Sequence, residues 1–265
     1  MSERAYRTIR YERSTDGAIA TVTMNRPERK NPLGPEMVNE LCWALDDAKH
    51  DEKVRVVILT GAGDAFSAGG DLKQMSGDAA GGAEPLPHKG DYVDLLLAFT
   101  TLGKPTIARV PGVAMGGGLG MVAACDFAIA RESATFGTPE IKRGLFPMMI
   151  MAVLRRVVSK RRLMEMMLLG EKLSARDAER LELISRAVPD SELDSAVSEL
   201  AGKLAAQSPT AMRMGLEAYH LQADLELAKA LPLLRDRLGA ILGTDDAREG
   251  LMAFLEKRAP VWTGR

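Results

Sequence analysis

The sequence is poor in several residue types on which protein chemistry often depends. Its 265 residues include two cysteines, three histidines and 5% aromatic residues, and its charges nearly cancel to a net −1 at pH 7. This balance gives no electrostatic reason to expect binding to nucleic acid or to an acidic membrane surface. Cys42 and Cys125 lie within apolar patterns, and neither they nor the histidines show metal-ligand spacing. We therefore expect no disulfide framework and no metal site.

Long apolar runs are missing as well. No run approaches the roughly 18 residues that a membrane-spanning helix needs, and the N-terminal stretch MSERAYRTIRYERS is polar without an apolar signal-peptide core. Together with the scarcity of cysteine, this pattern indicates a soluble protein of the reducing cytoplasm. Because 46% of the residues are hydrophobic, the chain is able to bury a full core.

Strand and helix signals alternate along the first half of the chain. The β-rich runs Tyr6–Glu12 and Ala18–Met24 are joined by the hairpin signal STDG, and Pro35 opens a pattern of helical spacing. Further strands are predicted at Val54–Thr60, Thr106–Val110 and Phe127–Ala130, and helices at Asp91–Leu102 and Gly117–Cys125. This order is typical of an α/β sheet covered by helices.

Helical periodicity dominates after Pro147, where Ile184–Val188 is the only strand expected. Helices are predicted near Met148–Val158, Lys160–Leu169, Ala175–Leu181, Ser191–Gln207, Pro209–His220, Leu225–Leu242 and Asp245–Lys257. We interpret residues 1–200 as the α/β core and residues 201–265 as a C-terminal helical region.

Two turns rich in small residues stand out, Ala65–Leu72 (AFSAGGDL) and Val110–Gly120 (VPGVAMGGGLG), each after an apolar run. Glycine and alanine let the backbone approach a ligand, and the N–H groups at a helix start lack intrahelical partners. Two such turns side by side would aim amide donors at one oxygen and form an oxyanion hole. The alternative is that both are merely tight αβ connections. Between the turns, residues 76–90 are rich in Gly, Ala and Pro and are expected to form a loop.

Those segments carry a resemblance to the crotonase family, also called the enoyl-CoA hydratase/isomerase superfamily. It extends nearly end to end through NRPERKNPL (25–33), AFSAGGDL, VPGVAMGGGLG, ATFGTPEIKRGLFP (134–147), GEKLSARDAERLELISRAVP (170–189) and REGLMAFLEKRAP (248–260). The resemblance implies a spiral of ββα units, a C-terminal helical region that mediates trimer contacts, and a homotrimer or a dimer of trimers. It also implies an acyl-CoA thioester as the substrate, with no separate cofactor, and a role in fatty acid metabolism.

The resemblance implies three catalytic positions. The backbone N–H groups of Ala68 and Gly117 match those that bind the thioester carbonyl oxygen, and Glu140 in FGTPE matches a catalytic carboxylate. A carboxyl group in an apolar pocket has a raised pKa, which suits it to exchange protons at the carbon beside a thioester.

The sequence departs from the hydratase pattern at Gly120, where the family's hydratases carry a second glutamate. Glycine cannot hold or deprotonate water, whereas moving a double bond from the 3-enoyl to the 2-enoyl position needs one base only. Isomerisation is therefore favoured over efficient hydration. Met148 stands where some relatives carry an acid, which argues against dienoyl isomerase or thioester hydrolase chemistry.

Recognition of coenzyme A is implied for a further set of residues. By resemblance, Ser67, Ala68, Gly70, Asp71 and Leu72 would line the adenine and pantetheine path through backbone contacts, and Lys257, from this or a neighbouring subunit, would meet a phosphate. A lone lysine in a C-terminal helix is otherwise a solvated residue.

Three other functions stay open. A hydratase would need an unidentified second acid, and a non-catalytic acyl-CoA-binding scaffold is compatible with Gly120. Residues 118–123 (GLGMVA) match the dinucleotide fingerprint G-x-G-x-x-G/A, with Glu140 about twenty residues on, but as an isolated motif this is weak.

Overall fold

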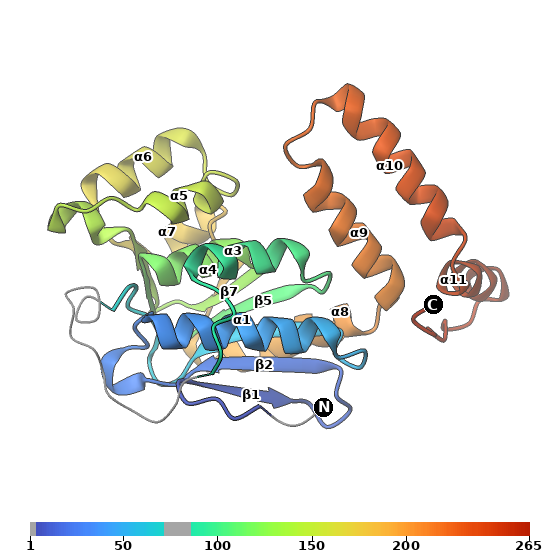
Figure 1. Cartoon of the computed structure of the whole chain (residues 1–265), viewed down its shortest axis with the longest axis horizontal. Coiled ribbons are helices and arrows are strands. Elements are labelled where there is room, and N and C mark those ends of the chain that lie inside the picture. The colour runs from blue at the N-terminus through green and yellow to red at the C-terminus, as the bar shows by residue number, and fades with distance from the viewer. Residues whose placement is uncertain (1–3, 72–85) are drawn as a thin grey trace.

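The chain is organised around two sheets. The computed structural model describes residues 4–71 and 86–265 (Figure 1). Six strands, in the order β1-β2-β3-β5-β7-β10, form the larger sheet, which is parallel except for the antiparallel pair of β1 and β2. The smaller sheet has the order β4-β6-β8-β9, and only β9 is antiparallel to its neighbour.

The strands of the larger sheet are β1 (Ile9–Arg13), β2 (Ile19–Met24), β3 (Val56–Gly61), β5 (Thr106–Val110), β7 (Phe127–Arg131) and β10 (Arg186–Val188). Those of the smaller sheet are β4 (Ala65–Ser67), β6 (Val113–Met115), β8 (Thr135–Gly137) and β9 (Leu173–Ser174). Along the chain, β3 is followed by β4, β5 by β6 and β7 by β8. Each turn of the chain therefore adds one strand to each sheet, which builds a spiral.

Helices pack on these sheets and continue beyond them. The α-helices are α1 (Pro35–His50), α3 (Tyr92–Thr101), α4 (Gly117–Ala124), α5 (Met148–Leu154), α6 (Lys160–Leu169), α7 (Ala175–Arg180), α8 (Leu193–Ala205), α9 (Pro209–Gln222), α10 (Leu227–Leu242) and α11 (Asp245–Glu256). Short 3₁₀ helices are η1 (Pro27–Arg29), η2 (Pro139–Arg143) and η3 (Asp190–Glu192).

The strand β3 shows why the larger sheet is covered on both faces. All six of its residues are buried. On one face Val56 and Ile58 pack with Val197 of α8, and on the other Val57 and Leu59 belong to the main core. A strand that is buried on both faces has a continuous apolar sequence, as expected for the inner strands of a parallel sheet.

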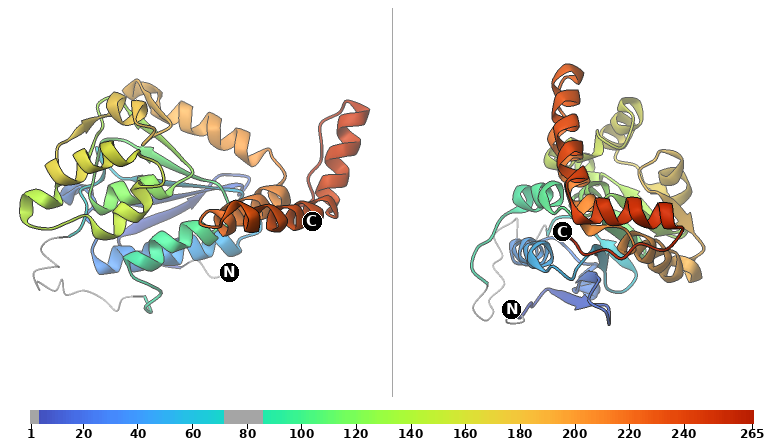
Figure 2. Two further views of the ribbon diagram at one scale, coloured as in Figure 1. Left: turned by 90° about the horizontal axis from the view of Figure 1, so that it is seen from above. Right: turned by 90° about the vertical axis from the view of Figure 1, so that its right-hand side faces the viewer.

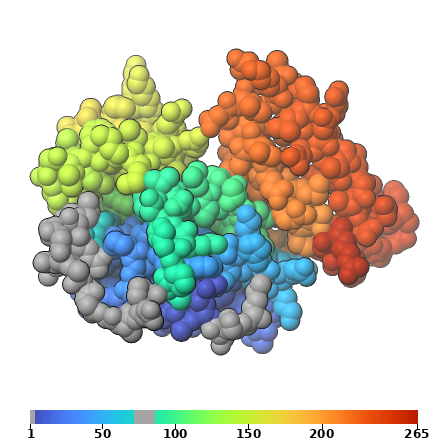
Figure 3. Space-filling model, viewed as in Figure 1, coloured from blue at the N-terminus to red at the C-terminus, as the bar shows by residue number. Residues whose placement is uncertain are grey.

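The last three helices stand apart from the sheets (Figures 1 and 2). In the space-filling view, α9, α10 and α11 form a separate lobe beside the core (Figure 3). Several large apolar side chains on this lobe are exposed, among them Leu227 (72%), Phe254 (81%) and Leu255 (73%). No helix within the described residues is long and apolar enough to cross a membrane.

The predicted α/β class is confirmed, but one expectation about the strands is wrong. The sequence indicated a single strand after Pro147, whereas β9 and β10 both follow it. The four strands of the smaller sheet, at most three residues long, were not predicted as strands. Such short runs cannot show the alternation from which a strand is inferred.

Candidate active site

A cavity of about 350 Å³ opens where the two glycine turns meet. Ala68, Gly69 and Gly70 line it from the first turn, and Gly116 and Gly117 from the second. The remaining lining is largely apolar and includes Leu33, Tyr92, Phe146, Met149 and Ile150, with Glu140 and Arg143 as the charged residues. An apolar cavity with a few polar groups is the usual form of a small-molecule site.

The first turn is held in place by the segment that precedes α1. The side-chain amide of Asn31 donates to the carbonyls of Ala62 (3.0 Å) and Ala65 (2.9 Å), and the Ser67 hydroxyl donates to the Asn31 carbonyl (2.8 Å). The Ala68 N–H donates to the Lys30 carbonyl at 2.8 Å. That donor is therefore already engaged within the protein and is not free to bind a thioester oxygen.

Gly70 offers the amide that Ala68 does not. Leu33 pairs with Gly70 in a parallel bridge, in which the Leu33 N–H donates to the Gly69 carbonyl (2.8 Å) and the Asp71 N–H donates to the Leu33 carbonyl (3.0 Å). Successive peptide groups of an extended strand point to opposite sides. The Gly70 N–H is therefore turned away from Leu33, and it has no hydrogen-bond partner within the described residues.

The second turn lies directly against the first. Gly69 has a φ of +94°, and a Cβ on it would lie 2.9 Å from the Met115 carbonyl oxygen. Gly116 has a φ of +51°, a conformation that side chains disfavour, and precedes the first residue of α4. That residue is Gly117, whose N–H has no intrahelical partner and none elsewhere in the described chain.

Glu140 faces these turns from η2. A Cβ on Gly116 would lie 2.8 Å from Glu140 Oε1, and Glu140 Oε2 is buried without a hydrogen-bond partner in the described residues. Burial raises the pKa of the Glu140 carboxyl, and the positive charge of Arg143 offsets part of this increase. Buried polar atoms are nearly always paired, so an unpaired oxygen that lines a cavity marks a group available to a ligand.

Two hydrogen bonds place Glu140 beside the second turn. The Gly116 N–H donates to the Gly137 carbonyl (3.0 Å), and the buried Thr138 hydroxyl donates to the Met166 carbonyl of α6 (2.7 Å). The residues just before Glu140 are thus tied to the glycine turn on one side and to α6 on the other.

Neighbouring side chains fill the space beside Gly120, the residue that stands in place of a second glutamate. A Cβ on Gly120 would lie 2.4 Å from Ile150 Cγ2 and 2.5 Å from the Tyr92 hydroxyl oxygen. The Tyr92 hydroxyl donates to the Gly117 carbonyl at 2.6 Å. Sequence reasoning missed Tyr92, because nothing in the spacing of a helix that starts near residue 91 connects it to the glycines of α4.

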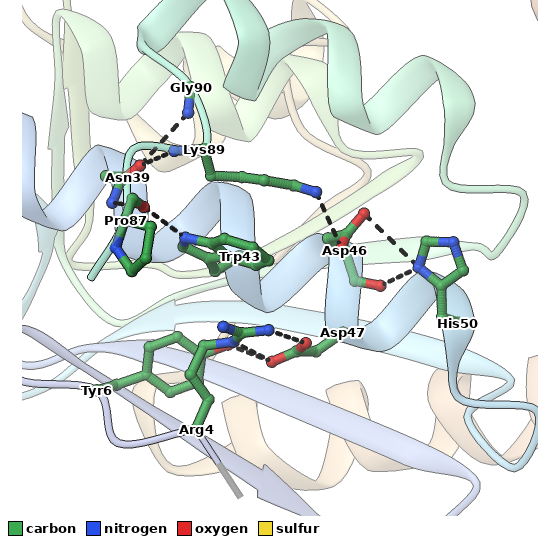
Figure 4. Close-up of polar contacts among 10 residues, drawn as sticks. All are labelled: Arg4, Tyr6, Asn39, Trp43, Asp46, Asp47, His50, Pro87, Lys89 and Gly90. Carbon is green, nitrogen blue, oxygen red and sulfur yellow. Dashed lines mark hydrogen bonds and ion pairs between the residues drawn. The ribbon is translucent and has the colours of Figure 1, made fainter. Parts of the chain in front are cut away.

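The segment that leads to Tyr92 is fastened to α1 (Figure 4). The Asn39 side chain donates to the Pro87 carbonyl (3.1 Å) and accepts from the Lys89 N–H (2.6 Å), while the indole N–H of Trp43 donates to the same Pro87 carbonyl (2.9 Å). The Lys89 ammonium pairs with Asp46 at 3.0 Å. These contacts fix the backbone immediately before α3.

Of the residues implied in coenzyme A binding, Ala68 and Gly70 line the cavity. Ser67 is fully buried and does not line the cavity, and the buried Asp71 carboxylate pairs with Arg29 at 2.8 Å. Leu72 and most of the loop predicted at 76–90 lie outside the described residues. Lys257 is exposed at the end of α11, on the projecting lobe.

The dinucleotide fingerprint has another explanation. A Cβ on Gly118 would lie 2.6 Å from Ser67 Cβ, and Gly120 packs against Ile150 and Tyr92. Both glycines allow close packing inside the protein, so this geometry does not support a pyrophosphate site.

The fold and the cavity define an α/β protein in which one carboxyl group is set among apolar side chains and unpaired backbone amides. A family model described as enoyl-CoA hydratase/isomerase matches residues 14–265. The chain belongs to this family of acyl-CoA enzymes, which includes lyases and isomerases.

Individual relatives agree with this assignment. A putative enoyl-CoA hydratase of Thermus thermophilus is 36% identical over 245 residues, which cover 92% of this chain and 97% of the relative. A probable enoyl-CoA hydratase of Mycobacterium tuberculosis is 35% identical over 98% of this chain and 99% of its own. The crystal structure of an enoyl-CoA hydratase of Mycobacterium smegmatis superposes with a TM-score of 0.88 at 34% identity, covering 97% and 99% of the two chains. The predicted crotonase-like fold is thereby confirmed.

Proposed function

We propose that the protein isomerises 3-enoyl-CoA to 2-enoyl-CoA thioesters, with Glu140 as the single acid-base group. The observation that carries this proposal is the half-buried Glu140 carboxyl, with one oxygen unpaired beside the glycine turns, next to a Gly120 that has no room for a second acid. A 1,3-proton shift needs one base that takes the proton from C2 and returns it at C4.

In the proposed mechanism, the thioester oxygen accepts hydrogen bonds from the N–H groups of Gly70 and Gly117. Removal of the C2 proton moves negative charge onto that oxygen and forms a dienolate. Preorganised donors at such an oxygen stabilise the transition state by about 3 to 4 kcal/mol each. Support for Gly70 in place of Ala68 comes from the pairing of Leu33 with the residues on either side of Gly70.

Hydration of 2-enoyl-CoA is the second candidate, because the relatives quoted above are named enoyl-CoA hydratases. It requires a group other than residue 120 to hold and deprotonate water. The charged residues that line the described cavity are Glu140 and Arg143, and guanidinium does not act as a base. This composition favours isomerisation.

The test compares the protein with its Glu140→Gln variant on 3-enoyl-CoA and 2-enoyl-CoA. The products are distinguished by mass and by the ultraviolet absorbance of the conjugated thioester. We expect the 3-enoyl substrate to be converted, and the variant to lose at least about a hundredfold in kcat while it keeps its affinity for acyl-CoA. Glu12→Gln, on the exposed side of β1, is the matched control.

Two results would reject the proposal. Faster turnover of the 2-enoyl than of the 3-enoyl substrate would assign the protein as a hydratase. Acyl-CoA binding without turnover of either substrate would identify a non-catalytic scaffold.

The finer points of binding and assembly belong to the same proposal. The backbone around Ala68 and Gly70 would line the pantetheine path, and Lys257 of a neighbouring subunit would meet a phosphate. Residues 201–265 would serve as the contact region of a homotrimer or a dimer of trimers, supported by the exposed apolar side chains on α10 and α11. The proposed site of action is the cytoplasm, although some relatives are named mitochondrial proteins.

A further inference from the structure

Tyr92 is the feature of the cavity that the proposed mechanism does not use. Its hydroxyl donates to the Gly117 carbonyl at 2.6 Å, and its ring atom Cζ lies 3.5 Å from the point where a Cβ on Gly117 would stand. Gly117 also carries one of the two proposed oxygen-binding N–H groups. The phenol therefore restrains the residue whose amide must stay aligned with the thioester oxygen.

The same hydroxyl occupies the space beside Gly120. Its oxygen lies 2.5 Å from the position of a Cβ on that residue, too close for any side chain to coexist with it. Together with Ile150, Tyr92 fills the volume that a side chain or an ordered water next to Gly120 would need.

Tyr92 is a poor base for water. Burial and the neighbouring charge of Glu140 raise the pKa of its hydroxyl above the ordinary value, so the phenol stays neutral in the working range of an enzyme. Its single O–H is committed to the Gly117 carbonyl, which leaves only acceptor lone pairs. A neutral phenol in this state cannot activate a nucleophile.

The backbone that carries Tyr92 is fixed at both ends. Asp91 caps α3 by accepting from the Val93 N–H (2.7 Å), and its own N–H donates to the Asp94 carboxylate (2.9 Å). The preceding residues are fastened to Asn39 and Trp43 of α1 (Figure 4). The phenol thus enters the cavity from a rigid support.

We propose that Tyr92 is a positioning residue that keeps the enzyme on the proton-transfer reaction and away from water addition. It does so by aligning Gly117 and by filling the space in which a hydrating water would be held. This inference rests on the proposed acyl-CoA chemistry and goes beyond it, because it assigns the choice between the two reactions to a residue other than Glu140.

The test uses Tyr92→Phe, which keeps the ring and removes the hydroxyl. The rates of 3-enoyl-CoA isomerisation and 2-enoyl-CoA hydration are measured on the full-length protein. Loss of one orienting hydrogen bond is expected to lower kcat for isomerisation about fivefold to tenfold, with a change in KM of less than about twofold. The vacated space admits a water, so the ratio of hydration to isomerisation is expected to rise at least about fivefold.

Tyr11→Phe is the matched control, because the Tyr11 hydroxyl on β1 is also buried but has no partner in the described residues. It is expected to leave both rates and their ratio unchanged. If the ratio of hydration to isomerisation is unchanged in Tyr92→Phe, the inference about Tyr92 is overturned, whether or not kcat for isomerisation falls. In that case, isomerisation by the parent protein still upholds the proposed function. Failure of the parent protein to convert either substrate rejects the proposed function and this inference with it.

Discussion

Ile150 closes the space beside Gly120: its Cγ2 atom lies 2.4 Å from the point at which a Cβ on that glycine would stand. Any substitution at residue 120 must therefore displace the start of α5 or the phenol of Tyr92. This packing relationship predicts that an acidic side chain at residue 120 would be poorly accommodated.

The first prediction concerns Gly120→Glu. The new side chain overpacks the region between α4 and α5, so we expect a loss of about 1 to 3 kcal/mol in the free energy of unfolding and no gain in hydration. Denaturant unfolding and the 2-enoyl-CoA assay measure the two effects. Gly202→Glu is the control, because no atom lies within 4 Å of a Cβ at residue 202. A stable Gly120→Glu variant that hydrates efficiently would contradict the packing argument.

The second prediction is a pH profile. As a base, Glu140 must be ionised, and burial raises the pKa of its carboxyl above the ordinary value of 4.5. The value of kcat/KM is therefore expected to fall as the pH is lowered through this raised pKa, about tenfold per pH unit below it. Stability shifts in the opposite sense: the folded state holds the proton more tightly than the unfolded chain, so this group's contribution to stability declines as the pH rises between the two pKa values.

The charge of Arg143 provides a check on that profile. Arg143 lowers the pKa of Glu140, so Arg143→Leu is expected to move the acidic limb to higher pH. Lys142→Leu, one residue earlier on η2, should leave the limb in place. A profile that does not respond to Arg143 would mean that another group titrates.

The third prediction tests the amide of Gly117. Proline is tolerated at the first position of a helix and lacks the N–H, so Gly117→Pro removes the donor at a site compatible with the fold of α4. We expect kcat/KM for isomerisation to fall about a hundredfold or more. Gly117→Ala keeps the N–H and brings its Cβ to 3.1 Å from Leu33 Cδ1, a contact that a flexible side chain can relieve. Equal losses in both variants would assign the effect to crowding and not to the donor.

The fourth prediction concerns the support of Tyr92. Asn39→Ala removes the donor to Pro87 and the acceptor for Lys89, both outside the cavity. With the segment before α3 released, we expect a lower kcat for isomerisation by about threefold to tenfold, with KM little changed. His50→Ala, farther along α1, is the control. Steady-state kinetics at matched protein stability provide the measurement, and an unchanged kcat would show that α3 holds Tyr92 unaided.

The fifth prediction addresses assembly. Phe254 is 81% exposed on α11, and a cluster of exposed apolar residues on one lobe is typical of a surface that another chain covers. Phe254→Glu is expected to shift the protein from trimers or larger assemblies toward monomers in analytical ultracentrifugation. Arg10→Glu, on the exposed side of β1, provides the charge control. A parent protein that sediments as a monomer would remove the trimer proposal.

Much of the molecule was accessible from the sequence because the signals are local. The helix that begins at Pro35, the strand Thr106–Val110 and the helix Lys160–Leu169 follow from periodicity and from proline at a helix start. The two glycine turns follow from small residues after apolar strands, whereas Glu140 was singled out by the resemblance of its FGTPE segment to the family.

Only the tertiary structure decided which groups face the cavity. The Ala68 N–H donates to the Lys30 carbonyl. Leu33 instead bonds to the residues on either side of Gly70, which leaves the Gly70 N–H pointing away from Leu33. Tyr92 meets Gly120 although the two are 28 positions apart. The physical reason is that an amide's direction and a cavity's free volume depend on residues distant in the chain, which folding brings into contact and which no local pattern records.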